Sequence, residues 1–158
     1  MIVDRKKIIG NQIDFAATDT ICFWAPYPEE LQNLQKREWM PVIKRMNDSG
    51  CDFQISNGLE VPELSEKTRL FLEKRLNALS DEALCAFAAV SGGCRSVILA
   101  LAVLDGFLSA DRAFELAVLE ESFQNRFWPC DEEALTAREN RKKDVVKAVE
   151  NLKGILNG

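Results

Sequence analysis

The sequence contains no histidine in its 158 residues. This absence excludes catalytic triads and general bases that depend on imidazole, His-ligated zinc, and haem attachment through a Cys-x-x-Cys-His motif. It also excludes the di-metal helix bundle, which needs Glu-x-x-His motifs. The G-x-x-x-x-G-K-[ST] and G-x-G-x-x-G nucleotide motifs and the G-x-S-x-G nucleophile motif are missing too. We therefore expect no enzyme, no cofactor and no metal site.

Paired cysteines and a targeting segment are also lacking. Residues 1–7 carry charges without a following apolar stretch, so they do not resemble a signal or transit peptide, and we expect a cytoplasmic protein. An odd cysteine count without a Cys-x-x-Cys pair is typical of free thiols in a reducing compartment. The five cysteines are Cys22, Cys51, Cys85, Cys94 and Cys130.

No apolar run is long enough to cross a membrane. Residues 83–104 are apolar on nearly every side, but Ser91-Gly92-Gly93 and Arg95 interrupt them, leaving less than the ~20 residues that a span needs. The glycines indicate close helix–helix approach better than a phosphate loop. This segment is therefore predicted to be a helix buried inside the protein, with no membrane insertion.

Excess positive charge is missing as well. The net charge is −5 and the sequence pI is about 4.9, which argues against a surface built to neutralise nucleic-acid phosphates. Nucleic acid is therefore not an expected partner.

The segments between glycines and prolines mostly show helical periodicity, which predicts a mainly all-α fold. We expect about six helices around a central buried helix at 84–104. A short first helix covers 3–17, with Phe15 placed inward, and a connector with buried side chains follows to residue 26. An Asn-Gly dipeptide within alternating residues 52–61 gives the one hairpin-like signal. The expected helix starts are Pro28, Ser65, Ser80, Ser109 and Asp131.

The predicted helix from Ser109 to Trp128 has two different stripes. The stripe expected to face the core consists of Leu116, Leu119, Phe123 and Phe127. The neighbouring stripe places an acid, an amide and a tryptophan in one row, namely Ala117, Glu121, Gln124 and Trp128. Trp128 could pack under the last helix while its polar neighbours are solvated. Alternatively, the row binds a protein, because an aromatic anchor beside polar groups is typical of an interaction hot spot.

The charge pattern adds to the protein-binding interpretation. Residues 105–133 contain eight acids and two bases, whereas the last helix carries a local excess of bases. The acidic block is therefore the better candidate for a docking surface. Its expected electrostatic rim consists of Glu120 and the cluster Asp131, Glu132 and Glu133.

Several motifs, in order along the chain, carry a family resemblance. Residues 119–128, LEESFQNRFW, with the acids at 131–133, resemble L-E-E-x-F-Q-x-x-x-W-G-x-x-E-E. Residues 18–23 are similar to T-D-x-L-C-Y, residues 39–41 to W-x-P, and residues 91–106 to an S-G-S-x-x-x-x-L-A-L-A-x-x-x-G helix. This set resembles the assembly chaperones that hold the alpha subunit of F-type ATP synthase, found in mitochondria and alphaproteobacteria. Pro129 departs from the pattern, because the family has glycine there.

The resemblance implies a helical domain over 1–158 that corresponds to the C-terminal domain of the family. Members normally carry an N-terminal α/β domain before this part, and the sequence shows none of it. Either the chain is a shortened homologue or part of the gene lies outside this sequence. The resemblance places bacterial members in the cytoplasm and eukaryotic relatives in the mitochondrial matrix.

The function implied by the resemblance is that of a chaperone without catalytic activity. Such a protein binds unassembled alpha subunit and shields the surface that later meets the beta subunit. Glu121, Gln124 and Trp128 are then the expected contact row. The alternative is a small helical adaptor or regulator that uses the same acidic face on another partner.

Overall fold

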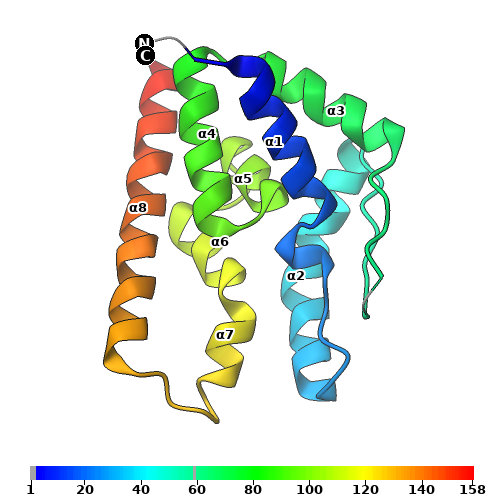
Figure 1. The fold of residues 1–158 in the computed structure, drawn as a ribbon, viewed down its shortest axis with the longest axis vertical. Helices are drawn as coiled ribbons and strands as arrows, with labels where there is room; N and C mark the ends of the chain where they lie inside the picture. Colours follow the sequence, from blue (N-terminus) through cyan, green and yellow to red (C-terminus); the bar gives the residue numbers. More distant parts are fainter. Residues whose placement is uncertain (1–2, 59) are drawn as a thin grey trace.

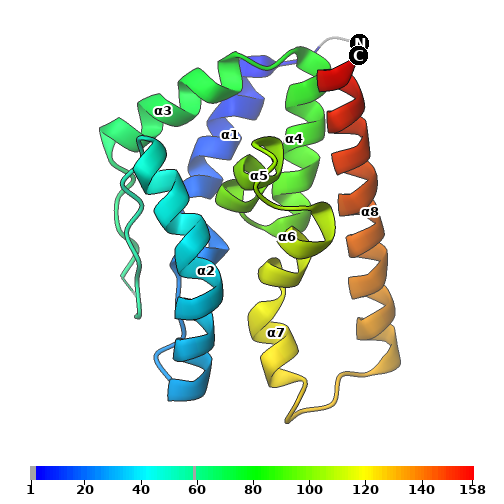
Figure 2. The same ribbon diagram turned by 180° about the vertical axis from the view of Figure 1, so that it is seen from behind.

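A computed structural model describes residues 3–58 and 60–158 and confirms the mainly helical fold (Figures 1 and 2). Among these residues there are eight α-helices and one short 3-10 helix. Their bounds are α1 Arg5–Ala17, η1 Thr20–Cys22, α2 Glu29–Ser49, α3 Glu66–Asn77, α4 Asp81–Cys94, α5 Val97–Leu104, α6 Ala110–Ala117, α7 Leu119–Gln124 and α8 Glu132–Asn157.

The helices surround α5, which lies at the centre of the molecule (Figures 1 and 2). Helices α4 and α8 lie side by side in opposite directions, and α1 packs on another side of α4. Helix α2 packs against α5. The beginning of α2 and the end of α7 lie at the same end of the molecule. This arrangement places the connection between α7 and α8 at one end, away from the main core.

The predicted helix starts are confirmed by side-chain caps. The hydroxyls of Ser65, Ser80 and Ser109 each accept a hydrogen bond from the backbone N–H three residues later, and so does the Asp131 carboxylate. Such a cap satisfies one of the free N–H groups at a helix start. Helix α2 begins one residue later than predicted, because Pro28 occupies the N-cap position.

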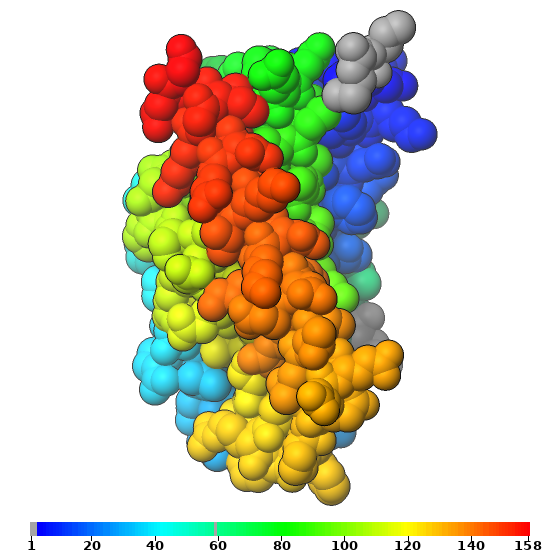
Figure 3. Space-filling view, turned by 90° about the vertical axis from the view of Figure 1, so that its left-hand side faces the viewer, coloured from blue at the N-terminus to red at the C-terminus, as the bar shows by residue number. Residues whose placement is uncertain are grey.

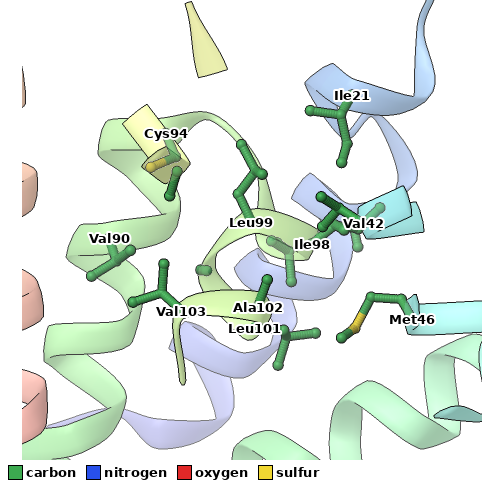
Figure 4. Close-up of a cluster of buried hydrophobic side chains, with 14 of the residues drawn as sticks. Ile21, Val42, Met46, Val90, Cys94, Ile98, Leu99, Leu101, Ala102 and Val103 are labelled. Carbon is green, nitrogen blue, oxygen red and sulfur yellow. The ribbon is translucent and has the colours of Figure 1, made fainter. Parts of the chain in front are cut away.

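Helix α5 forms the centre of the hydrophobic core. Its residues from Val97 to Val103 are all buried, and they contact side chains from η1, α2 and α4 (Figure 4). Met46 and Val42 of α2 approach from one side, and Val90 of α4 from the other (Figure 4). In the described residues, no helix has the length and apolar character needed to cross a membrane.

The prediction of one continuous helix at 84–104 was wrong, because the chain breaks at Arg95 and Ser96. Arg95 adopts a left-handed conformation with φ 53° and ends α4, and Ser96 caps α5. The buried Asp19 carboxylate fixes this break: it accepts hydrogen bonds from the Ser96 hydroxyl at 2.6 Å and from the Ile98 backbone N–H at 2.9 Å. Since Asp19 comes from the connector after α1, helical periodicity alone gives no sign of the break.

The predicted close approach at the glycines is confirmed for Gly93. A Cβ added there would lie 2.3 Å from Cγ2 of Val145 in α8, whereas a Cβ added at Gly92 would meet nothing within 4 Å. Gly93 therefore allows α8 to pack closely against α4.

Two expectations about the first half of the chain need revision. Phe15 is exposed, although the sequence placed it inward. Residues 50–64 reverse direction as a hairpin would (Figure 1), with Leu59 outside the described residues. The backbone hydrogen bonds of Ser56 nevertheless go to the connector, because its N–H donates to the Cys22 carbonyl and its own carbonyl accepts from the Trp24 N–H. The segment is thus attached through a parallel bridge between Phe23 and Ser56.

A candidate protein-binding site at the end of α7

The predicted helix from Ser109 to Trp128 is divided at Val118 into α6 and α7. At this break the buried Trp39 indole donates a hydrogen bond to the Leu116 backbone carbonyl at 2.8 Å. That carbonyl belongs to the last turn of α6, where helical carbonyls lack a full set of partners. Trp39 thus supplies, from within the core, the hydrogen-bond donor that a carbonyl at the end of α6 lacks. Helix α7 then continues the chain in a different direction.

Phe123 attaches α7 to the start of α2. It is 5% exposed and packs with Ala25, Leu31 and Leu34 in a small hydrophobic cluster. Arg126 lies 3.6 Å from Glu30 of α2, which adds an ion pair across the same contact. These contacts hold the end of α7 and the beginning of α2 together at one end of the molecule (Figure 1).

Three aromatic side chains are exposed at this end, which we call the aromatic end: Tyr27 is 77% exposed, Phe127 57% and Trp128 76%. Tyr27 precedes α2, whereas Phe127 and Trp128 follow α7. The prediction that Phe127 faces the core was wrong: α7 ends at Gln124, and the exposed Phe127 ring lies beside Phe123, with centroids 5.4 Å apart. Exposed aromatic surface of this kind marks interaction sites.

The predicted row survives the break at Val118 in its last three members. The Asn125 N–H donates to the Glu121 carbonyl, and the Trp128 N–H donates to the Gln124 carbonyl at 2.8 Å, so hydrogen-bonded turns follow α7 as far as Trp128. Glu121, Gln124 and Trp128 are all exposed, whereas Glu120 is half-buried. Ala117 ends α6 and does not belong to α7 or to these turns.

The acidic cluster lies at the beginning of α8 and is exposed. Asp131 caps the helix by accepting from the Ala134 N–H at 2.7 Å. Glu132 and Glu133 occupy the first turn, where negative charge complements the helix dipole. The space-filling view shows α8 along one face, with residues 125–131 at the lower end (Figure 3). The cluster thus has a structural role and also borders the aromatic end.

Two features of this region were missed by sequence reasoning. Tyr27 belongs to the aromatic end, but it lies far from α7 in sequence and no periodic pattern includes it. Arginines of α8 lie beside α6 and α7: Arg138 donates to the Ser122 hydroxyl of α7 at 3.1 Å, and the Arg141 guanidinium lies 5.2 Å from the centre of the Phe114 ring of α6. Burial lowers the pKa of Arg141, as does the charge of Arg95, whereas the Glu121 carboxylate counteracts this shift. Glu121 therefore faces positive charge on α8.

The chemistry available here is that of protein recognition. In the part of the chain that the structure describes, no three cysteine, aspartate or glutamate side chains converge as metal ligands. The aromatic end is exposed, with acids beside it and the arginines of α8 nearby. Such a surface offers an apolar anchor with a charged rim.

Comparison with known proteins identifies relatives over most of the chain. A family model described as ATP12 chaperone protein matches residues 2–47. The mitochondrial protein atp12 of Schizosaccharomyces pombe is 28% identical over 140 residues, which cover 83% of this chain and 48% of that protein.

Solved structures agree with this relationship. Atp12 from Paracoccus denitrificans superposes with a TM-score of 0.88 at 25% identity, covering 93% of this chain and 64% of that one. The Atu1473 protein from Agrobacterium tumefaciens gives a TM-score of 0.87 at 26% identity, covering 97% of this chain and 57% of that one.

The fold is that of the helical part of these solved structures. The chain is a relative of the ATP12 chaperone family, as the sequence motifs indicated. It spans about half the length of the curated relative that it matches.

Proposed function

We propose that this chain is an assembly chaperone for F-type ATP synthase that binds the unassembled alpha subunit. It shields the subunit interface of alpha until the beta subunit replaces it, and it does so without catalysis, in the cytoplasm of a bacterium or the matrix of a mitochondrion. The relation to ATP12 chaperones supports the class of function. The observation that carries the binding role is the aromatic end, with its three exposed rings.

The proposed client is an alpha subunit that has not yet assembled. An unassembled subunit exposes apolar interface that aggregates easily, and a chaperone must cover it with apolar surface of its own. Trp128 and its neighbours supply such surface on a single helical domain, and this domain is the proposed binding unit. Because acidic groups border it, the encounter is steered by charge, while the apolar anchor supplies most of the affinity.

Within this surface we assign Glu121, Gln124 and Trp128 as the contact row. The rim consists of Glu120, Asp131, Glu132 and Glu133. Their exposure supports this assignment, since only the half-buried Glu120 has restricted access. Phe127 and Tyr27 extend the apolar contact beyond the row.

The test is to co-express the chain with alpha and beta subunits, purify it and identify what it retains. We expect alpha alone, released when beta is added. Trp128→Ala should weaken binding by about 30-fold, as for a hot spot worth about 2 kcal/mol. Glu121→Lys should also weaken it without unfolding the helix. Leu70→Ala is the matched control, because Leu70 is 52% exposed on α3 and far from the aromatic end in sequence.

The adaptor alternative makes a different prediction in the same assay. An adaptor that relies on the acidic face would ignore alpha subunit, and its binding to a basic partner would weaken strongly with salt. Normal retention of alpha by both Trp128→Ala and Glu121→Lys would show that the row has a structural role only.

A further inference from the structure

A second surface lies between the C-terminal ends of α1 and α4, which pack side by side (Figure 1). There the structure has a hollow of about 220 Å³. Phe15 forms one wall, and its ring is exposed. The other lining residues carry hydroxyl groups, a guanidinium group or no side chain, and are Thr18, Thr20, Ser91, Gly92 and Arg95.

Ser91 supplies a buried hydroxyl to this hollow. The residue is 2% exposed, and its Oγ makes no hydrogen bond within the part of the chain that the structure describes. Buried hydroxyls in folded proteins almost always have a partner, because leaving one without costs free energy. An unpartnered hydroxyl lining a hollow is therefore a sign of a ligand group that completes it.

Arg95 is placed at the hollow by a strained backbone. It is the one non-glycine residue with positive φ among those described, at a helix end where glycine is the usual residue. The turn is fixed from the connector, since the Arg95 carbonyl accepts from the Thr20 N–H and Asp19 holds Ser96. The backbone would favour glycine, so the arginine is there for its side chain.

Two arginines of α8, Arg138 and Arg141, add positive charge near Arg95. None of the ion pairs found among residues 3–58 and 60–158 involves Arg95, Arg138 or Arg141. Arg138 Nη1 and Arg141 Nε are also buried without an acceptor. Besides burial, the charges of Arg95 and Arg138 both lower the pKa of Arg141, and the Glu121 carboxylate opposes this shift. The three arginines thus form a local excess of positive charge on an otherwise acidic protein.

We propose that this hollow, together with the three arginines, binds an acidic segment of a protein partner. One carboxylate of that segment enters the hollow, where the Arg95 guanidinium donates to it in the fork geometry that suits carboxylates and the Ser91 hydroxyl donates a further hydrogen bond. Phe15 packs against the aliphatic part of the same side chain. The volume suits a single side chain and lies below the roughly 300–1,000 Å³ of small-molecule sites. The hollow itself shares no lining residue with the aromatic end or the contact row, so it does not depend on which client binds there.

The first test needs no client. The isotopically labelled chain is titrated with a hexaglutamate peptide at low ionic strength and followed by NMR. We expect the backbone amide signals of Thr20, Gly92 and Arg95 to shift and to saturate at a Kd on the order of 1 mM, as for a weak single-site peptide contact. The absence of these shifts would overturn the proposal. So would equal shifts with inorganic phosphate, because they would define a site for small anions.

Variants at Arg95 separate binding from folding. Arg95→Gly should abolish the shifts while raising the thermal midpoint, because glycine relieves the left-handed strain. Arg95→Gln should weaken binding at least about tenfold, as expected for losing a charged hydrogen bond. Arg45→Gln is the control, since it removes one charge from an exposed position on α2. Normal hexaglutamate binding by Arg95→Gly would refute the assignment.

A cross-linking experiment then addresses the full complex. A photoreactive amino acid placed at Phe15 should cross-link alpha subunit through a segment that contains aspartate or glutamate, and Arg95→Gln should remove the product. The same group placed at Trp128 reports on the aromatic end. Cross-linking from Trp128 but not from Phe15 would leave the chaperone function standing and overturn this inference for alpha. Cross-linking from neither site would contradict the chaperone function, and the peptide titration would still decide this site.

Discussion

Two adjacent glycines should respond to the same substitution with opposite signs. An alanine Cβ at Gly93 would lie 2.3 Å from Cγ2 of Val145, which is buried and belongs to a stiff β-branched side chain on α8. Overpacking of this kind costs about 1–3 kcal/mol, and the gain in helix propensity returns about 1 kcal/mol. With a cost near the upper end, Gly93→Ala should lower the free energy of unfolding by about 2 kcal/mol. At Gly92 no atom lies within 4 Å, so only the propensity gain remains.

The assay is thermal and urea unfolding of both variants. For a domain of this size we expect a midpoint lower by about 4–8 °C for Gly93→Ala and higher by about 2 °C for Gly92→Ala. Val145→Ala should remove most of the penalty when combined with Gly93→Ala, so the double-mutant cycle should show coupling of at least about 1 kcal/mol. Equal stability of the two single variants, or additive effects in the cycle, would refute the close approach of α4 and α8 as the cause.

Three further predictions concern buried polar groups and thiols. Burial raises the pKa of Asp19 from 3.8 to about 6, against hydrogen bonds from Ile98 and Ser96 that lower it. The folded chain therefore holds a proton that the unfolded chain has lost, and the free energy of unfolding should fall by about 3 kcal/mol as pH rises from about 4 to 6. Asp19→Asn should lack this slope in urea unfolding at several pH values; an identical slope would assign it to other groups. Trp39→Phe should cost about 1–3 kcal/mol, because the Leu116 carbonyl loses its indole partner; an unchanged urea midpoint would contradict this. Burial raises the pKa of the Cys22 thiol, and it raises the pKa values of Cys51 and Cys94 to about 12. A thiol reagent at pH 8 should therefore modify the half-buried Cys85 and Cys130 first, which peptide mass spectrometry can check. Early modification of Cys22 would show that the core opens easily.

The sequence predicted the local features of this fold well. The helix starts at Ser65, Ser80, Ser109 and Asp131 were found because a cap lies within three residues of the N–H that it satisfies. The burial of α5 was found because its apolar residues occur in one short run.

The two helix breaks could not be found in this way. Asp19 fixes the break between α4 and α5 from 77 positions away, and Trp39 satisfies the end of α6 across the same separation. In both cases a tertiary hydrogen bond determines where a helix ends, which periodicity does not encode. Both residues nevertheless lie in motifs that carry the family resemblance.

The candidate site shows the same division. The exposure of Glu121 and Gln124 follows from their spacing on α7, and the turns after α7 leave Trp128 exposed beside them. The exposure of Phe127 does not, because it depends on where α7 ends. Tyr27 and the arginines of α8 join the region through packing between distant segments, so no local pattern could have included them.

Helix α8 is anchored unevenly along its length. Its buried residues are Val145, Ala148, Val149 and Leu152, all in the C-terminal half. The N-terminal half is held through side-chain contacts of Arg138, Arg141 and Lys142. Its backbone amides should consequently exchange with solvent through local opening that leaves the core intact, at a lower free energy than those of the C-terminal half. The acidic beginning of α8 can thus adapt to a bound protein, or release it, without any cost to the stability of the domain that carries it.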